Sequence, residues 1–269
     1  MTGLLSLPAN PAAELVLSIR RDPVRFVTDF HGQEVIGKQQ DILQALATPG
    51  VREVHVKACH AIGKTHICSR AVSWFLAAYP HDSIVLTTAP SWPQVEDQIW
   101  REIRDGVAKA KVNLGGRLMK TTWEFGPKHY ATGIATSPET AVNIQGYHAA
   151  HVLVIVDEAD GVAQAIWDAV DGLATSAHVV VLAIGNPINP QSAWRKRYER
   201  AQTDPHAVCI VSSLLAAREK ASQLPSSRVR TVRAAPKRAT STPYDRTPLR
   251  TIRPLARSSH ESGIKTSVP

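Results

Sequence analysis

The stretch Val54–His66 constrains the fold of this chain more than any other part of its sequence. The alternating valines at 54 and 56 predict a buried strand, and the run from Ile67 to Ala78 is apolar over the length of a helix. Between these two segments lies the tripeptide Gly63-Lys64-Thr65. A strand, a glycine-containing loop and a helix in this order are typical of a loop whose backbone N–H groups bind phosphate.

The loop predicts a nucleotide site for ATP and Mg²⁺. In such a loop the Lys64 ammonium reaches the β- and γ-phosphates, and the Thr65 hydroxyl is a ligand of the metal. The fingerprint G-x-x-x-x-G-K-[ST] has a glycine where this chain has Ala58, so the match is incomplete. The residues predicted to bind the nucleotide are Ala58, Cys59, His60, Ala61, Ile62, Gly63, Lys64, Thr65 and His66.

A second motif runs from His151 to Asp160 and consists of an unbroken apolar segment that ends in carboxylates. Such a segment is typical of a central parallel strand covered on both faces, and open α/β sheets bind ligands at the carboxyl ends of their strands. We therefore expect Asp157 to hold Mg²⁺ through water and Glu158 to polarise the attacking water as a general base. A buried strand followed by a helix-capping acid is the simpler alternative. The two motifs in this order favour an ATPase.

Two amides extend the predicted site. Gln39 opens a helical pattern upstream of the loop, where its amide could read the adenine edge, although a solvent-facing glutamine fits the same spacing. Asn186 follows the next buried strand, in Gly185-Asn186-Pro187, where it could bind the γ-phosphate and report hydrolysis. The same tripeptide also makes a good turn. His148 and His151 are interpreted as ordinary polar loop residues rather than zinc ligands.

Strands alternate with helices along the chain, which predicts an α/β fold with a mostly parallel sheet and helices on both faces. Together with the glycine loop and the Asp157-Glu158 motif, we interpret this fold as a RecA-like P-loop ATPase of the ASCE type. We expect three parts, namely an N-terminal segment over 1–32, the ATPase domain over 33–215, and a tail over 216–269. Further strands are predicted at 84–89, 121–125, 130–136, 179–184 and 207–212, and further helices at 12–20, 94–111, 162–173 and 191–201.

The positive charge lies in the tail. The chain has 31 Lys and Arg and 23 Asp and Glu, a net charge of +8, and residues 221–269 hold ten of the bases and two of the acids. Residues 1–220 therefore carry 21 of each and are neutral. The Ser/Pro/Arg-rich tail is expected to be disordered, because it cannot bury enough apolar area. It could bind DNA phosphates or remain inert. Three scattered cysteines fit a reducing compartment, and no apolar run is long enough to span a membrane.

The motifs together resemble the ATPase domain of the large terminase subunit, the DNA-packaging motor of tailed phages. The resemblance covers residues 33–212 in family order. It implies the roles given above for Lys64, Thr65, Asp157, Glu158, Gln39 and Asn186. Some relatives carry an arginine in the phosphate loop where this chain has His60, so Lys57 or an arginine of a neighbouring subunit could take that role. The segments that carry the resemblance begin at Lys57, Thr87, Ile144, Val154 and Ala183, with short matches at Gln39 and Ile166.

The resemblance also implies partners: double-stranded DNA, a portal protein, a small terminase subunit, and further copies of the chain in a ring. We expect the protein in the host cytoplasm, transiently at the portal vertex. The nuclease domain of full terminases needs several carboxylates, whereas beyond residue 212 the chain has Glu219, Asp245 and Glu261. We therefore expect no nuclease here, and a truncated or frame-altered gene would explain the change in composition.

Two other functions remain open. A helicase-like remodelling ATPase fits residues 157–160, which spell Asp-Glu-Ala-Asp, and the upstream Gln39. Against it, Gly-Asn-Pro stands where Ser-Ala-Thr is usual, and no second RecA-like lobe follows. The other alternative is an inactive prophage remnant that binds nucleotide or DNA without turnover.

Overall fold

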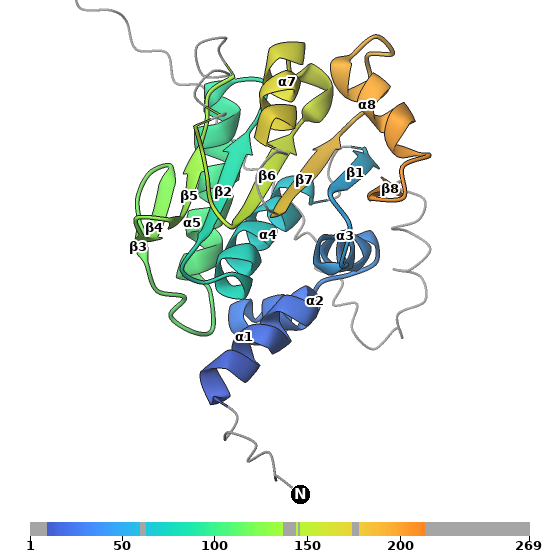
Figure 1. Cartoon of the computed structure of the whole chain (residues 1–269). Helices are drawn as coiled ribbons and strands as arrows, with labels where there is room; N and C mark the ends of the chain where they lie inside the picture. The colour runs from blue at the N-terminus through green and yellow to red at the C-terminus, as the bar shows by residue number, and fades with distance from the viewer. Residues whose placement is uncertain (1–9, 60–62, 137–143, 145, 174–177, 213–269) are drawn as a thin grey trace, which may run out of the picture. The chain divides into compact units, whose positions relative to one another are not determined.

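The computed structural model describes residues 10–59, 63–136, 144, 146–173 and 178–212, and the following statements concern these residues. Their central element is an eight-stranded sheet with the strand order β3-β4-β5-β2-β6-β7-β1-β8 (Figure 1). The six strands from β5 to β8 in this order are parallel, and β4 pairs antiparallel with both β5 and β3. The strands are β1 (Glu53–Ala58), β2 (Ser83–Thr88), β3 (Arg117–Leu118), β4 (Thr122–Gly126), β5 (His129–Gly133), β6 (His151–Asp157), β7 (His178–Gly185) and β8 (Ala207–Ser212).

Helices cover both faces of the sheet, so the predicted fold class is confirmed. Alternate residues of the central strands point to opposite faces, as the period of two requires. Leu153 and Leu182 belong to the core under α4 and α5, whereas Val154 and Val181 belong to the core under α7 and α8. The helices on the first face are α3 (Lys38–Ala47), α4 (Lys64–Ala78) and α5 (Trp100–Ala108), and those on the second are α7 (Gln164–Leu173) and α8 (Ala193–Ala201).

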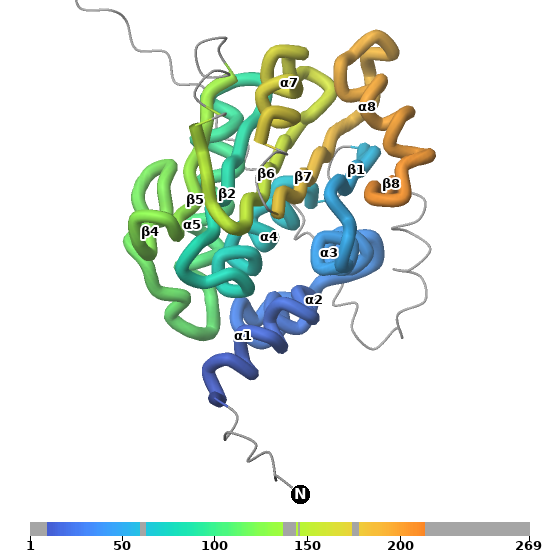
Figure 2. The backbone as a smooth tube through the Cα atoms, viewed as in Figure 1, coloured from blue at the N-terminus to red at the C-terminus, as the bar shows by residue number. Residues whose placement is uncertain are grey.

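The N-terminal residues pack against α4 (Figure 2). They form α1 (Pro11–Arg21), the single turn α2 (Pro23–Phe26) and a π-helical turn η1 (Val27–His31). The Trp74 indole donates to the Ile19 carbonyl at 2.8 Å, and the Arg20 guanidinium donates to the Ala78 carbonyl at 3.1 Å. His31 is buried between Ser73 and Gly106, and this burial lowers its pKa to about 4. The end of the predicted segment 1–32 is therefore anchored to the core.

The sequence prediction was wrong in detail at several places, and it did not include the two-residue strand β3. A single helix was expected over 94–111, but the chain forms a π-helical segment, η2 (Gln94–Ile99), followed by α5. Hydrophobic spacing does not separate the two helix types, because Val95, Ile99 and Ile103 are buried in either case. The sequence prediction also missed α2 and η1, which are each a single turn. The boundaries at 33 and 215 stay predictions, and the tail lies outside the described residues.

No helix among the described residues is long and apolar enough to cross a membrane.

Candidate functional site

The phosphate loop follows β1, and Gly63 is the N-cap residue that precedes α4. Gly63 has φ +77°, in the left-handed region that favours glycine, and it is the residue before the first turn of the helix. The next side chain, Lys64, is buried, and its ammonium lies 3.1 Å from Glu158 Oε1 and 3.5 Å from the Cys59 carbonyl oxygen. The Lys64 ammonium thus lies between Glu158 and the Cys59 carbonyl, at the N-terminal end of α4 where an anion is favoured.

The carboxylate motif lies directly beside this loop. Thr65 Oγ1 donates a hydrogen bond to Asp157 Oδ2 at 3.0 Å, although the two residues are 92 positions apart. The other oxygen of Asp157 accepts from the Glu158 backbone N–H at 2.9 Å. The structure therefore brings together the two motifs that the sequence predicted to act together.

Glu158 has an unusual backbone conformation, with φ 47° and ψ 46°. Left-handed non-glycine residues cost roughly 1–3 kcal/mol and cluster at functional sites. This conformation turns the chain sharply after β6 and leaves the Glu158 side chain partly exposed beside Lys64, while Asp157 stays buried. One turn thus gives two adjacent carboxylates different surroundings.

The donor set at this turn fits Mg²⁺. Burial raises the pKa of Asp157, while the Thr65 hydrogen bond acts in the opposite direction and the charge of Glu158 adds to the rise. A nearby cation would relieve this cost. The Thr65 hydroxyl and the Asp157 carboxylate are hard oxygen donors, and Mg²⁺ in phosphate sites takes one or two such groups together with phosphates and waters. No cluster of three His, Cys, Asp or Glu side chains suited to a metal occurs in the described part of the chain.

The position of Ala58 does not require the glycine that the fingerprint has there. It is the last residue of β1, is buried, and lies in register with Ser212 of β8. Among the described residues the only non-glycine residues with positive φ are His81 and Glu158, so the Ala58 backbone does not require a glycine. Cys59 is described beside it, whereas His60, Ala61 and Ile62 lie outside the described residues.

The side chains of Gln39 and His66 both lie close to the phosphate loop. A Cβ atom at Gly63 would lie 2.8 Å from the Gln39 side-chain nitrogen, which places this amide against the loop. The contact of Gln39 with adenine stays a prediction. His66 Nδ1 lies 2.9 Å from Glu102 Oε1, and the same oxygen is 3.2 Å from the buried Arg70 guanidinium. His66 is thereby oriented by α5, a contact that the sequence prediction missed.

Asn186 follows β7 immediately and lies beside the carboxylate turn. Two residues before it, Ile184 of β7 lies in register with Asp157 of β6. A Cβ atom on Gly185 would lie 2.9 Å from the backbone nitrogen of Ala159, so the end of β7 contacts the turn closely. The role of Asn186 as a sensor and its contact with the γ-phosphate stay predictions.

Two sequence interpretations are corrected by the structure. His151 is not a loop residue: it begins β6, and its Nδ1 lies 3.1 Å from Nδ1 of His178, the first residue of β7. Lys57 does not substitute for a loop arginine, because its ammonium lies 3.5 Å from the Tyr198 ring centroid, under α8. Odd positions of β1 face α8, as the period of two requires, whereas Val54, Val56 and Ala58 face the α4 side.

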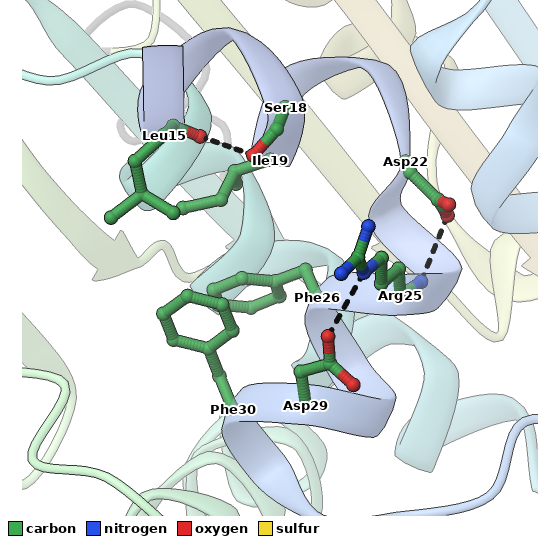
Figure 3. A pocket seen from close by; sticks show the side chains of 8 residues that line it. All are labelled: Leu15, Ser18, Ile19, Asp22, Arg25, Phe26, Asp29 and Phe30. Atoms are coloured by element: carbon green, nitrogen blue, oxygen red, sulfur yellow. Dashed lines mark hydrogen bonds and ion pairs between the residues drawn. The ribbon is translucent and has the colours of Figure 1, made fainter. Parts of the chain in front are cut away.

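A cavity of about 120 Å³ lies between α1 and the turns α2 and η1 (Figure 3). It contains none of the predicted site residues. Its walls combine apolar side chains with an exposed ion pair between Arg25 and Asp29 at 3.0 Å. The lining residues are Leu15, Ser18, Ile19, Asp22, Arg25, Phe26, Asp29 and Phe30.

Comparisons with known proteins support the interpretation of the motifs. The chain is 25% identical over 200 residues to a probable terminase large subunit of Enterobacteria phage P7, a match over 71% of this chain. The chain spans 40% of the length of that relative. No family model matches the chain.

Solved structures show the same fold. A point mutant of the large terminase ATPase domain of Thermus phage P74-26 matches with a TM-score of 0.57 at 16% identity, over 76% of this chain and 90% of that one. The large terminase of a thermophilic bacteriophage in complex with ADP matches with a TM-score of 0.52 at 12% identity, over 68% and 48%. The resemblance found from the motifs is thus confirmed: the chain is similar in sequence to a large terminase subunit and has the fold of the ATPase domain of these proteins.

Proposed function

We propose that the chain binds and hydrolyses ATP with Mg²⁺ and uses the energy to move double-stranded viral DNA into a capsid. The observation that carries this proposal is the meeting of the two motifs: Lys64 with Glu158 at 3.1 Å, and Thr65 with Asp157 at 3.0 Å. The sequence relative is a probable terminase large subunit, and solved relatives with the same fold include one in complex with ADP.

In this proposal each residue of the site has a separate role in ATP binding or hydrolysis. ATP phosphates bind at the N-terminus of α4, where backbone N–H groups and the Lys64 ammonium face them. Lys64 then exchanges its ion pair with Glu158 for one with the phosphates, and the freed carboxylate of Glu158 orients the attacking water and accepts its proton. Thr65 and Asp157 would hold Mg²⁺, which neutralises developing charge on the phosphates.

The partners follow from the same proposal. Packaging would require DNA, a portal protein, a small terminase subunit and a ring of copies in the host cytoplasm. Residues 58–66 include no arginine, and we therefore propose that a neighbouring copy of the chain supplies one to the γ-phosphate. Such an arginine typically raises the rate by about 10³–10⁵.

Duplex DNA should stimulate ATP hydrolysis by the full chain, because a packaging motor couples turnover to its DNA track. The measurement is the steady-state rate of phosphate release with Mg²⁺, with and without blunt duplex DNA, beside Lys64→Ala as the control for contaminating ATPases. A Lys64-dependent rate that DNA leaves unchanged would contradict the DNA part of the proposal. Separation of the strands by the chain would favour a helicase-like activity instead.

A further inference from the structure

The Asp160 carboxylate binds the loop that follows β7. Asp160 lies two residues after Glu158, in a short 3₁₀ turn (η3, Ala159–Gly161), and is partly buried. Its Oδ2 accepts hydrogen bonds from the backbone N–H groups of Ile188 at 3.1 Å and Asn189 at 2.8 Å. Its Oδ1 accepts from the Ser192 hydroxyl at 2.7 Å. Both oxygens are therefore used, and all three donors belong to one loop.

A backbone contact joins the same two segments independently of this side chain. At Gly185, a Cβ atom would lie 2.9 Å from Ala159 N, 3.3 Å from Asp160 N and 3.4 Å from the carbonyl carbon of Glu158. Contacts below 3.0 Å with backbone cannot be relieved by moving a side chain. The turn that carries Glu158 is thus packed directly on the residue before Asn186.

The loop is continuous with α8, which reaches back to the strand before the phosphate loop. Ser192, held by Asp160, also caps α8 by accepting a hydrogen bond from the Arg195 N–H at 3.1 Å. Further along α8, the Trp194 indole donates to His55 of β1 at 3.1 Å, and the Arg197 guanidinium binds Glu53 of β1 at 2.6 Å. A displacement of the Glu158 turn would therefore act on α8 through Asp160.

We propose that Asp160 is a positioning residue that fixes the Asn186 loop and α8 to the Glu158 turn, so that a change at the γ-phosphate is transmitted to α8. This role rests on the proposed ATP hydrolysis. It assigns Asp160 no contact with nucleotide or metal. The proposed role depends on the position of the two side-chain oxygens and not on the negative charge of Asp160. Two polar atoms in the same positions, one facing the two N–H groups and one facing the Ser192 hydroxyl, would be sufficient. Asparagine can supply them, since its amide oxygen accepts from both N–H groups and its NH₂ group donates to the Ser192 hydroxyl.

The test compares Asp160→Ala and Asp160→Asn with the wild-type full chain. In the alanine variant we expect kcat for ATP hydrolysis to fall about 10- to 100-fold, because the catalytic geometry loosens, with KM within a few-fold of wild type. The asparagine variant should restore most of the rate. Hydrogen exchange supplies the second readout: Mg²⁺ with ATP-γ-S should change exchange in residues 193–201 of the wild type and of the asparagine variant, but not of the alanine variant.

The results distinguish a failure of the proposed function from a failure of the role of Asp160. A wild-type chain that fails to bind ATP-γ-S would overturn the proposed function and this role with it. Lys64-dependent binding and turnover, with an alanine variant that matches wild type in rate and in α8 exchange, would overturn the role of Asp160 alone. An asparagine variant as slow as the alanine variant would also overturn the positioning role, because the charge would then be essential. Should the alanine variant not fold, Asp160→Ser, whose side chain is too short to span the three donors, replaces it.

Discussion

Replacing Glu158 with glutamine should abolish turnover of ATP while leaving ATP binding intact. Glutamine has the shape of glutamate but cannot accept the proton of the attacking water, and a general base typically contributes about 10²–10⁴ in rate. Binding should be retained or become tighter, because the carboxylate that pairs with Lys64 at 3.1 Å no longer competes with the phosphates. Single-turnover hydrolysis and titration with a fluorescent ATP analogue measure the two effects separately.

A matched control for this variant is Glu199→Gln, the same chemical change on α8, where the side chain is exposed and pairs with Arg195 one turn away. We expect it to hydrolyse ATP at the wild-type rate. If Glu158→Gln kept more than about a tenth of the wild-type rate, which corresponds to an activation barrier raised by less than roughly 1.4 kcal/mol, Glu158 would not be the general base.

The second large effect concerns stability. Arg197 is buried and binds both oxygens of Glu53, at 2.6 and 3.1 Å, as well as Asp171 at 2.6 Å. Arg197→Met keeps much of the side-chain volume but leaves the Glu53 carboxylate without its main cation, which typically costs about 3–5 kcal/mol. Thermal and urea unfolding should therefore show a large loss. Arg195→Met, the same change at a half-exposed site on the same helix, should cost no more than about 1 kcal/mol.

The loss should depend on pH in a defined direction. Burial by itself raises the pKa of Glu53, but the hydrogen bond from His55 and the charge of Arg197 outweigh it and lower the pKa to about 2. A carboxylate with a depressed pKa stabilises the fold above its unfolded pKa of about 4.5, and this contribution is lost as the pH falls toward 2. The difference between wild type and Arg197→Met should shrink over that range. A difference that stays constant from pH 7 to pH 3 would show that packing, not charge, dominates.

His55 completes this network as a neutral side chain. The Trp194 indole can only donate, so His55 Nδ1, which lies 3.1 Å away, must be the acceptor. The proton is then on Nε2, which donates to Glu53 Oε2 at 2.6 Å. The contact of His55 with Glu53 is therefore a hydrogen bond and not an ion pair, which leaves Arg197 as the main counter-ion.

The sequence predicted the parts of the fold that hydrophobic periodicity determines. The central strands, such as β6, are continuous apolar runs because helices cover both sides of the sheet, and their ends were correctly placed to within a few residues. Lys64, Thr65, Asp157 and Glu158 could be chosen in advance because parallel strands present their carboxyl ends at one edge, beside the glycine loop.

The rest depends on contacts between segments far apart in the sequence. The hydrogen bonds that Asp160 accepts from residues 188, 189 and 192, and the contact between His66 and Glu102, join segments whose spacing in the sequence carries no periodic signal. The left-handed conformation of Glu158 could not be predicted from residue propensities either, because glutamate seldom adopts it. Lys57 shows the converse error: a basic residue near the loop in sequence points to the other face of the sheet, since strand residues alternate.

The central claim is that the loop containing Lys64 and the turn containing Glu158 form one site that hydrolyses ATP. The most direct measurement is phosphate release by the full chain with ATP and Mg²⁺, for the wild type and for Lys64→Ala under identical conditions. The account predicts turnover by the wild type that requires Mg²⁺ and disappears in the variant together with nucleotide binding. Turnover that persists without Lys64, or a wild type that binds no nucleotide, would contradict it.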